Sequence, residues 1–423
     1  MLLLFSVFLI LLLLNIPIVV VIGISSLAYL FLNDIPPLLI GQRITTSLLS
    51  FPLLAIPFFI LLAEVLNHGG ATQRLMRLVV SIVGFIRGGL GLANVGISML
   101  FSGISGTALA DTSGLGSTLI PSMKKQGYSS KYAAAVTAAS STVGPIIPPS
   151  VPLIIAGVIA GLSIYDLFLA GAIPGLLMGF AMMVTAYIIA LKRKYPRSNR
   201  FETKEVWASL KGCIWEISLI IFILYGILGG VFTATEAGAM GVIYALFLGF
   251  VVRRELTFKK LYRACVETTA LSGIVLIIVG FASTFGWIIA MERFPELFSE
   301  WILAITVVPI LALLLVNLVL LVIGAVMETT AALIIVLPTL LLLGSSIGVD
   351  PIQMTIIVVL NLILGLLTPP IGMALYIVSS ISKEKIGAIV KEVFPFFIAN
   401  LFVLLLVIMF PKISLWLPTL LNR

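Results

Sequence analysis

Two segments of this 423-residue chain place oxygen donors where an apolar stretch is interrupted. The first runs from Gly103-Ile104-Ser105-Gly106 to Pro148-Pro149, and the second runs from Gly324 to Pro369-Pro370. Positions 103, 144 and 149 recur 221 residues later, at 324, 365 and 370, with the same glycine or proline each time. Matched interruptions in two halves of an apolar chain are typical of the binding site of a membrane transporter.

The interruptions free backbone groups that something other than lipid must satisfy. An unpaired N–H or C=O costs several kcal/mol in hydrocarbon, so such groups face a wet cavity or bind a ligand. Carbonyl and hydroxyl oxygens suit a hard cation, and helix N-termini after the two turns favour an anion. We therefore expect two cations and one carboxylate between the interrupted segments. The cation donors are the carbonyls of Gly103, Ser105, Gly144 and Ile147 in one cage, and those of Gly324, Gly365 and Pro370 with the Thr368 hydroxyl in the other.

Polar side chains near the interruptions are candidates for supporting roles. Asp111 and Glu328 each either cap a helix or help to coordinate a cation, since a carboxylate near the bilayer centre costs about 2.5–3.5 kcal/mol without a partner or a role. Ser140 either bonds back to its own helix or serves the site. Asn361 lies two turns from Thr368 on the same interrupted helix and is expected to line the cavity.

Composition places the chain in a membrane. Hydrophobic residues make up 61% and charged residues 10%, which excludes an ordinary soluble domain, and about ten stretches approach the roughly 20 residues of a span. The net charge of +8 is concentrated in loops between apolar stretches, which marks those loops as cytoplasmic rather than as a nucleic-acid surface. We expect residues 1–14 to be a retained membrane anchor. We expect no chemical role for three residues, Cys213, Cys265 and the single histidine, His68.

The charges predict an all-α polytopic membrane protein built from inverted repeats. The first repeat covers residues 1–191, a basic cytoplasmic linker covers 192–211, and the second repeat covers 212–423. Each repeat is expected to contain a re-entrant hairpin (90–123 and 311–343), a broken helix (131–160 and 351–380) and a helix on the membrane surface (70–87 and 291–308).

Enzymatic motifs are weak or missing. The serine in Gly103-Ile104-Ser105-Gly106 resembles an intramembrane protease nucleophile, but the single histidine precedes it at the membrane surface and leaves it without a general base. Thr142-Val143-Gly144 resembles a potassium-channel filter, yet Pro145 replaces the expected aromatic residue. No Walker motif is present. We expect a protein that is not an enzyme.

Several motifs carry a resemblance to one transporter family along almost the full chain. The chain resembles the large membrane subunit, DctM-like, of tripartite ATP-independent periplasmic (TRAP) transporters. The matching stretches are Phe101–Gly106, Ala110–Ser113, Thr235–Gly238, Met327–Leu333 and Asn361–Pro370.

The resemblance implies an elevator-type fold like that of the ion-transporter superfamily, in the bacterial inner membrane. It implies import of an organic acid anion driven by sodium (Na⁺), with two partners: a small four-helix membrane subunit and a periplasmic substrate-binding protein. It also implies sodium ligands at Gly103, Ser105, Gly144, Ile147 and Pro149, and at Gly324, Gly365, Thr368 and Met373.

Two alternatives remain open on the sequence. A standalone sodium–dicarboxylate symporter with the same architecture would work without a binding protein. A scaffold or assembly subunit would show no ion dependence and would tolerate substitution at Gly103 or Thr368.

Overall fold

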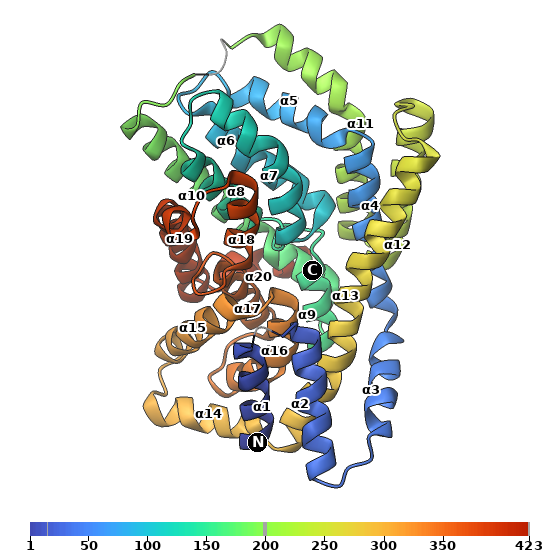
Figure 1. The fold of residues 1–423 in the computed structure, drawn as a ribbon, viewed down its shortest axis with the longest axis vertical. Helices are drawn as coiled ribbons and strands as arrows, with labels where there is room; N and C mark the ends of the chain where they lie inside the picture. The colour runs from blue at the N-terminus through green and yellow to red at the C-terminus, as the bar shows by residue number, and fades with distance from the viewer. Residues whose placement is uncertain (15, 198–200, 422–423) are drawn as a thin grey trace.

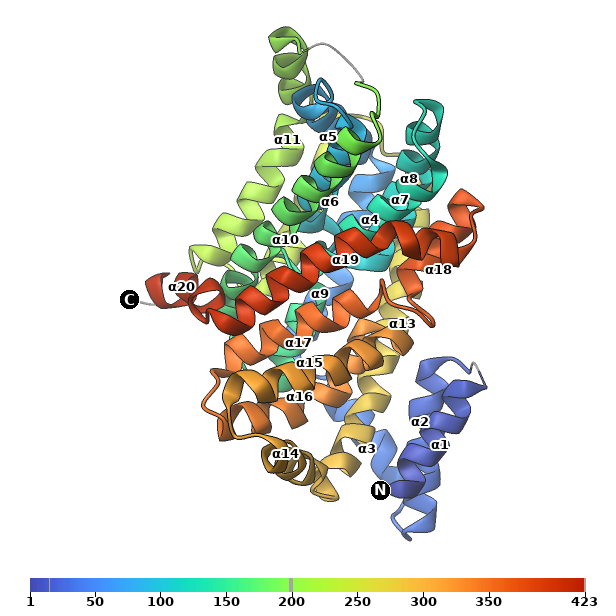
Figure 2. The same cartoon turned by 90° about the vertical axis from the view of Figure 1, so that its left-hand side faces the viewer.

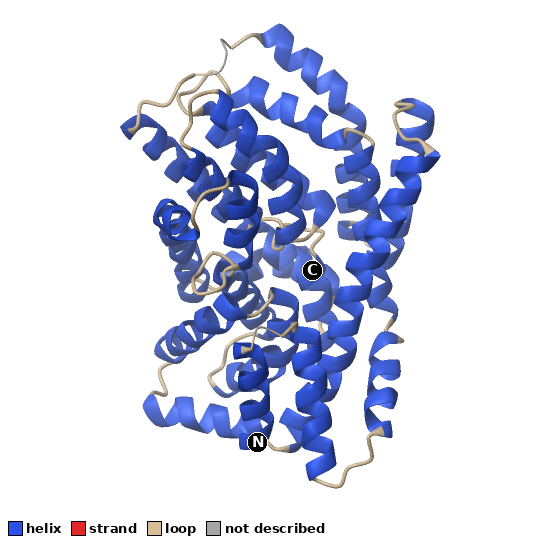
Figure 3. Cartoon of the chain, in the orientation of Figure 1, coloured by secondary structure: helices blue, strands red, loops and turns tan. Residues whose placement is uncertain are grey.

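A computed structural model describes residues 1–14, 16–197 and 201–421. Within these residues every regular element is a helix (Figure 3). Among the described residues, eight helices are long and apolar enough to cross a membrane, and six further apolar helices are shorter. The all-helical membrane fold is therefore confirmed. Eight long spans appear instead of about ten because the interrupted helices are split into pieces that are too short to be counted.

Each half of the chain contains a helical hairpin followed by an interrupted helix. The hairpins are α6 (Gly89–Ser105) with α7 (Ala108–Lys125), and α15 (Pro309–Val326) with α16 (Thr329–Ser346). The interrupted helices are α8 (Ser130–Ser141) with α9 (Val151–Ala160), and α17 (Pro351–Gly365) with α18 (Met373–Ser382). The 221-residue offset relates α7 to α16 at both ends. The hairpins and interruptions lie where the sequence places them, and their re-entrance into a bilayer stays a prediction.

Two short amphipathic helices lie at opposite ends of the molecule. α5 (Ala71–Val83) crosses one end and α14 (Phe294–Ile305) crosses the other (Figure 1). Both were expected on membrane surfaces, and their opposite placement agrees with an inverted relation between the halves.

The remaining helices enclose these elements. They are α1 (Leu2–Leu13), α2 (Ile18–Leu32), α3 (Leu38–Leu48), η1 (Phe51–Leu54), α4 (Ala55–His68), α10 (Ile164–Lys192), α11 (Thr203–Leu228), α12 (Ala234–Phe247), η2 (Leu248–Val252), α13 (Phe258–Met291), α19 (Ile386–Met409) and α20 (Lys412–Leu421). α11 begins inside the predicted linker 192–211 and has non-helical dihedral angles at Cys213. The division into two repeats and a linker otherwise stays a prediction.

The half-helices that precede the interruptions form the centre of the fold. Every residue of α8 from Tyr132 to Ser141 is buried, and so is every residue of α17 from Gln353 to Gly365. Each hairpin also contacts the opposite repeat, since α7 packs on α18 and α16 packs on α9 (Figure 2). α10 and α19 pack together beside them. The two interruptions are thus held by elements of both halves.

A buried charge cluster fixes α5 against α11. The Glu216 carboxylate is fully buried. It accepts hydrogen bonds from Arg74 Nε at 2.7 Å and from Arg253 Nη2 at 2.8 Å. The two guanidinium groups also reach backbone carbonyls of Gly69 and Gly212. Because a buried charge requires close partners, this cluster determines where the surface helix sits.

Candidate functional site

The candidate site consists of two junctions, one in each repeat, where a hairpin meets an interrupted helix. In the first junction the Val151 N–H donates to the carbonyl of Gly106 at 3.3 Å. In the second the Gly372 N–H donates to the carbonyl of Ala325 at 3.1 Å. Gly106 and Gly372 both have positive φ, which favours glycine. Both Pro-Pro bonds, 148–149 and 369–370, are cis.

The first junction brings Asp111 against the interruption. Asp111 lies in the first turn of α7 and is fully buried. A methyl group at Gly144 would lie 2.5 Å from Asp111 Oδ2, so the absence of a side chain at Gly144 admits the carboxylate. Thr112 and Ser141 join the same helices through their hydroxyls at 2.5 Å. An acidic group therefore lies directly beside the predicted cation ligands.

Several predicted ligands of the first junction keep their oxygens available. Across the interruption, described residues donate to the carbonyls of Ser141, Val143 and Pro145 but not to those of Gly144, Ile147 or Pro149. The Ser150 side chain caps α9, because its hydroxyl accepts the Leu153 N–H at 3.2 Å. Gly103 and Ser105 belong to the last turn of α6, and the side chains of residues 103–105 lie outside the described part of the structure.

The second junction is built on a direct contact between two glycines. A Cβ at Gly365 would lie within 3.0 Å of the Cα, C and O atoms of Gly324. The Gly365 carbonyl accepts the Thr368 N–H at 2.9 Å. The Thr368 hydroxyl donates to Leu364 at 3.1 Å. The first of these bonds occupies one predicted ligand, the Gly365 carbonyl. The Thr368 hydroxyl donates its hydrogen and so keeps its oxygen lone pairs, and the Pro370 carbonyl accepts no hydrogen bond from a described residue.

The two junctions differ in exposure. Pro148 and Pro149 are buried, while Pro369 and Pro370 are exposed. Thr368 and Met373 are half-buried. The prolines of the second interruption therefore lie on the surface of this chain, and those of the first interruption lie in its interior.

The supporting residues divide into a helix cap and hydrogen-bonded pairs. Glu328 Oε2 accepts the backbone N–H groups of Thr330 at 2.8 Å and Ala331 at 3.2 Å, so its carboxylate caps α16. Ser140 Oγ donates to Asn94 Oδ1 at 3.0 Å. Asn361 Nδ2 donates to the backbone oxygen of Asn317 at 2.9 Å. Sequence reasoning missed the two asparagine partners: the 221-residue offset makes Ser140 and Asn361 equivalent, but it relates Asn94 to Leu315 rather than to Asn317.

Comparisons with known proteins identify the family. Residues 5–413 match the family described as "Tripartite ATP-independent periplasmic transporter, DctM component". The chain belongs to this family. It is 40% identical over 396 residues to the sialic acid TRAP transporter large permease protein SiaM of Vibrio cholerae, covering 93% of each chain. It is 34% identical over 372 residues to the 2,3-diketo-L-gulonate TRAP transporter large permease protein YiaN of Escherichia coli, covering 88% of this chain and 87% of that relative.

Another DctM relative is longer than this chain. The isethionate TRAP transporter permease protein DctMQ of Oleidesulfovibrio alaskensis is 36% identical over 419 residues, which cover 98% of this chain and 65% of the relative. Among solved structures, the YdaH transporter of Alcanivorax borkumensis superposes with a TM-score of 0.61 at 14% identity, covering 93% of this chain and 89% of that one. The predicted family is therefore confirmed, and the structural likeness supports the transporter fold.

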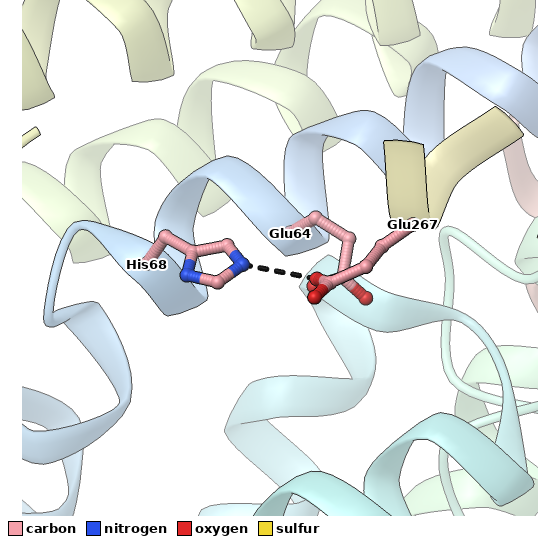
Figure 4. A group of neighbouring side chains, drawn as sticks. All are labelled: Glu64, His68 and Glu267. Carbon is pink, nitrogen blue, oxygen red and sulfur yellow. Dashed lines mark hydrogen bonds and ion pairs between the residues drawn. The ribbon is translucent and has the colours of Figure 1, made fainter. Parts of the chain in front are cut away.

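A separate polar group of this DctM-family protein joins α4 to α13. His68 Nε2 lies 2.9 Å from Glu267 Oε2. Glu64 lies one turn before His68, and one donor atom from each of the three residues falls within 4.8 Å of the others. Figure 4 shows the Glu64 and Glu267 carboxylates facing one another beside the imidazole. No chemical role was expected for His68. The structure places it in this interhelical contact, which is distinct from the two junctions.

Proposed function

We propose that this chain is the transport subunit of a sodium-driven importer of a small organic acid anion. The observation that supports the proposal is the pair of hairpin–interruption junctions, which concentrates carbonyl oxygens and helix N-termini at matched positions of the two repeats, with Asp111 beside the first junction. Oxygen donors suit sodium, and helix N-termini suit a carboxylate. Two sodium ions would bind at the predicted ligands of the two junctions.

The proposed partners follow from the family. A small membrane subunit would complete the membrane complex, and a substrate-binding protein in the periplasm would deliver the anion to it. Relatives are named for sialic acid, 2,3-diketo-L-gulonate and C4-dicarboxylates. All three classes carry a carboxylate, and we propose the same chemical class here. The proposed location is the bacterial inner membrane.

Sodium coupling would contribute energy to the uptake of a monoanion. Each elementary charge that crosses 100 mV contributes about 2.3 kcal/mol. Two sodium ions entering with one monoanion carry one net positive charge, so the membrane potential alone supplies roughly that amount, and the sodium gradient adds to it. We propose that the hairpins and interrupted helices carry the bound ions and substrate by sliding against the surrounding helices.

The test is uptake by proteoliposomes that contain this chain and its small subunit. The labelled substrates would be sialic acid, 2,3-diketo-L-gulonate and succinate, each with its binding protein and with or without an inward sodium gradient. Thr368→Val removes the hydroxyl at nearly constant volume, and Thr368→Ser restores it. We expect uptake by the wild type to depend on sodium. Thr368→Val should lower this uptake at least tenfold, and Thr368→Ser should largely retain it.

The outcomes separate this proposal from its alternatives. Uptake that proceeds without a binding protein would favour a standalone sodium–dicarboxylate symporter. Uptake indifferent to sodium would contradict the two-cage mechanism, and a complete lack of transport with every substrate would favour a scaffold subunit.

A further inference from the structure

Equivalent positions of the two repeats carry hydrogen bonds that lie outside the proposed ion sites. Ser140 and Asn361 are 221 residues apart, and each lies one turn before the glycine of its interruption, Gly144 or Gly365. Each bonds to an asparagine on the first helix of the neighbouring hairpin. The same connection is thus made twice, with different side chains in the two repeats.

In the first repeat the asparagine is Asn94, which is fully buried. Its Oδ1 accepts from Ser140 at 3.0 Å, and its Nδ2 donates to Thr137 Oγ1 at 2.7 Å. The same Nδ2 lies 3.6 Å from the sulfur of Met123 on α7. Asn94 therefore connects α6 to the interrupted helix α8 and to the second helix of its own hairpin.

In the second repeat the asparagine is Asn317, which is 5% exposed. Asn361 Nδ2 donates both to the backbone oxygen and to the Oδ1 of Asn317. Asn317 Nδ2 donates in turn to the Leu313 carbonyl at 2.6 Å. The amide pair lies between α15 and the buried helix α17, which pack directly on one another.

The amide pair and the glycine contact act on the same two helices. Asn361 precedes Gly365 by one turn of α17, and Asn317 precedes Gly324 by about two turns of α15. Two neighbouring points of attachment fix both the rotation and the axial register of a packed helix pair. A carbonyl cage holds a hard cation at about 2.3–2.6 Å, so a small change of register would misplace its ligands.

We propose that Asn94 and Asn317 are positioning residues that set the sodium affinity of the two junctions. They touch neither ion nor substrate; they hold the first helix of each hairpin in register with the interrupted helix that supplies the ligands. The inference rests on the proposed sodium coupling and adds residues to it that lie outside the cages.

The experiment measures the sodium concentration that gives half-maximal uptake, together with the sodium-induced rise in melting temperature of the purified protein. Asn94→Leu and Asn317→Leu remove each amide, and the double variant Asn317→Leu/Asn361→Leu removes both partners of one pair. If Asn317→Leu is not recovered from the membrane, Asn317→Gln is measured in its place. Leu313→Ala is the matched control, since it weakens the packing of α15 but leaves the amide pair in place.

We expect the single variants Asn94→Leu and Asn317→Leu each to raise the half-maximal sodium concentration about fivefold, while their maximal uptake at saturating sodium changes less than twofold. The double variant should raise the half-maximal sodium concentration at least as far as Asn317→Leu, because it also removes the bond from Asn361 Nδ2 to the Asn317 backbone oxygen, which Asn317→Leu leaves in place. Leu313→Ala should lower the melting temperature and leave sodium affinity unchanged. Wild-type sodium affinity in Asn94→Leu and Asn317→Leu, or an equal shift in Leu313→Ala, would overturn the inference. Sodium-independent uptake by the wild type would instead refute the proposed function.

Discussion

Glycine at the contact between hairpin and interruption is a steric requirement in both repeats, although its neighbour differs. Gly365 lies against the backbone of Gly324, and Gly144 lies against the Asp111 carboxylate. A backbone contact leaves no flexible side chain to move aside. The second junction is therefore the more sensitive of the two to an added methyl group.

Gly365→Ala is predicted to abolish transport and to destabilise the protein. The new methyl group would overlap backbone atoms of Gly324, so α15 and α17 would separate, at a cost typical of overpacking, about 1–3 kcal/mol. Uptake and the melting temperature of the purified protein measure the two effects. Gly387→Ala is the control, because nothing lies within 4 Å of the position of its Cβ; transport that survives Gly365→Ala would show that the glycine contact is dispensable.

Some contacts of single residues could not be predicted from the sequence. The sequence offered capping or cation coordination for both Asp111 and Glu328, and the structure gives Glu328 a cap at the start of α16. Nothing in the sequence pairs Asp111 with Gly144 or Asn361 with Asn317, because helix rotation decides which side chains meet. That rotation depends on packing among several helices, which local patterns do not encode.

At the scale of elements, the surface helix α5 depends on a charge cluster rather than on apolar contact alone. Glu216 on α11 is fully buried between Arg74 and Arg253, whereas Glu267 on α13 is 49% exposed beside His68. Removing one member of a buried charge cluster leaves the others without compensation. An exposed pair contributes little because water and salt screen it.

Glu216→Gln is therefore predicted to destabilise the protein by about 3–5 kcal/mol, and Glu267→Gln by less than about 1 kcal/mol. Thermal unfolding in detergent, monitored for both variants, gives the comparison. Proteolytic sensitivity near α5 should rise in the first variant only. Equal effects of the two substitutions would mean that the Glu216 cluster does not anchor α5.

Elements were more predictable than their contacts. The hairpins, interruptions and surface helices begin and end within a few residues of the expected positions, because glycine, proline and charge mark where apolar helices stop. The start of α11 was not predicted from the sequence, because residues 203 to 211 form a polar helical segment inside an otherwise basic linker. The cross-repeat packing of α7 on α18 and α16 on α9 required the structure, as it joins segments more than 150 residues apart.

For the whole molecule, an apolar cavity of about 300 Å³ lies beside the second hairpin, where the hairpin packs on α13 and α14. Phe285 and Ile289 of α13 line it opposite Ile335 and Val336 of α16, with further apolar side chains of α1, α14 and α15 around them. Lining atoms beside a void lack partners and lose contact energy. An interface with fewer contacts offers less resistance to sliding, which suits the motion proposed for the hairpins.

A reversible cross-link across this cavity is therefore predicted to stop transport. Cysteines at Ile289 and Val336, introduced with Cys213→Ala and Cys265→Ser, would be joined by a short bifunctional thiol reagent that carries a reducible disulfide. Fixing α16 to α13 prevents the hairpin from moving past that helix, so uptake should fall at least tenfold and recover after reduction. Each single-cysteine variant treated with the same reagent controls for modification alone, and full uptake by the cross-linked double variant would exclude relative movement of these two helices during transport.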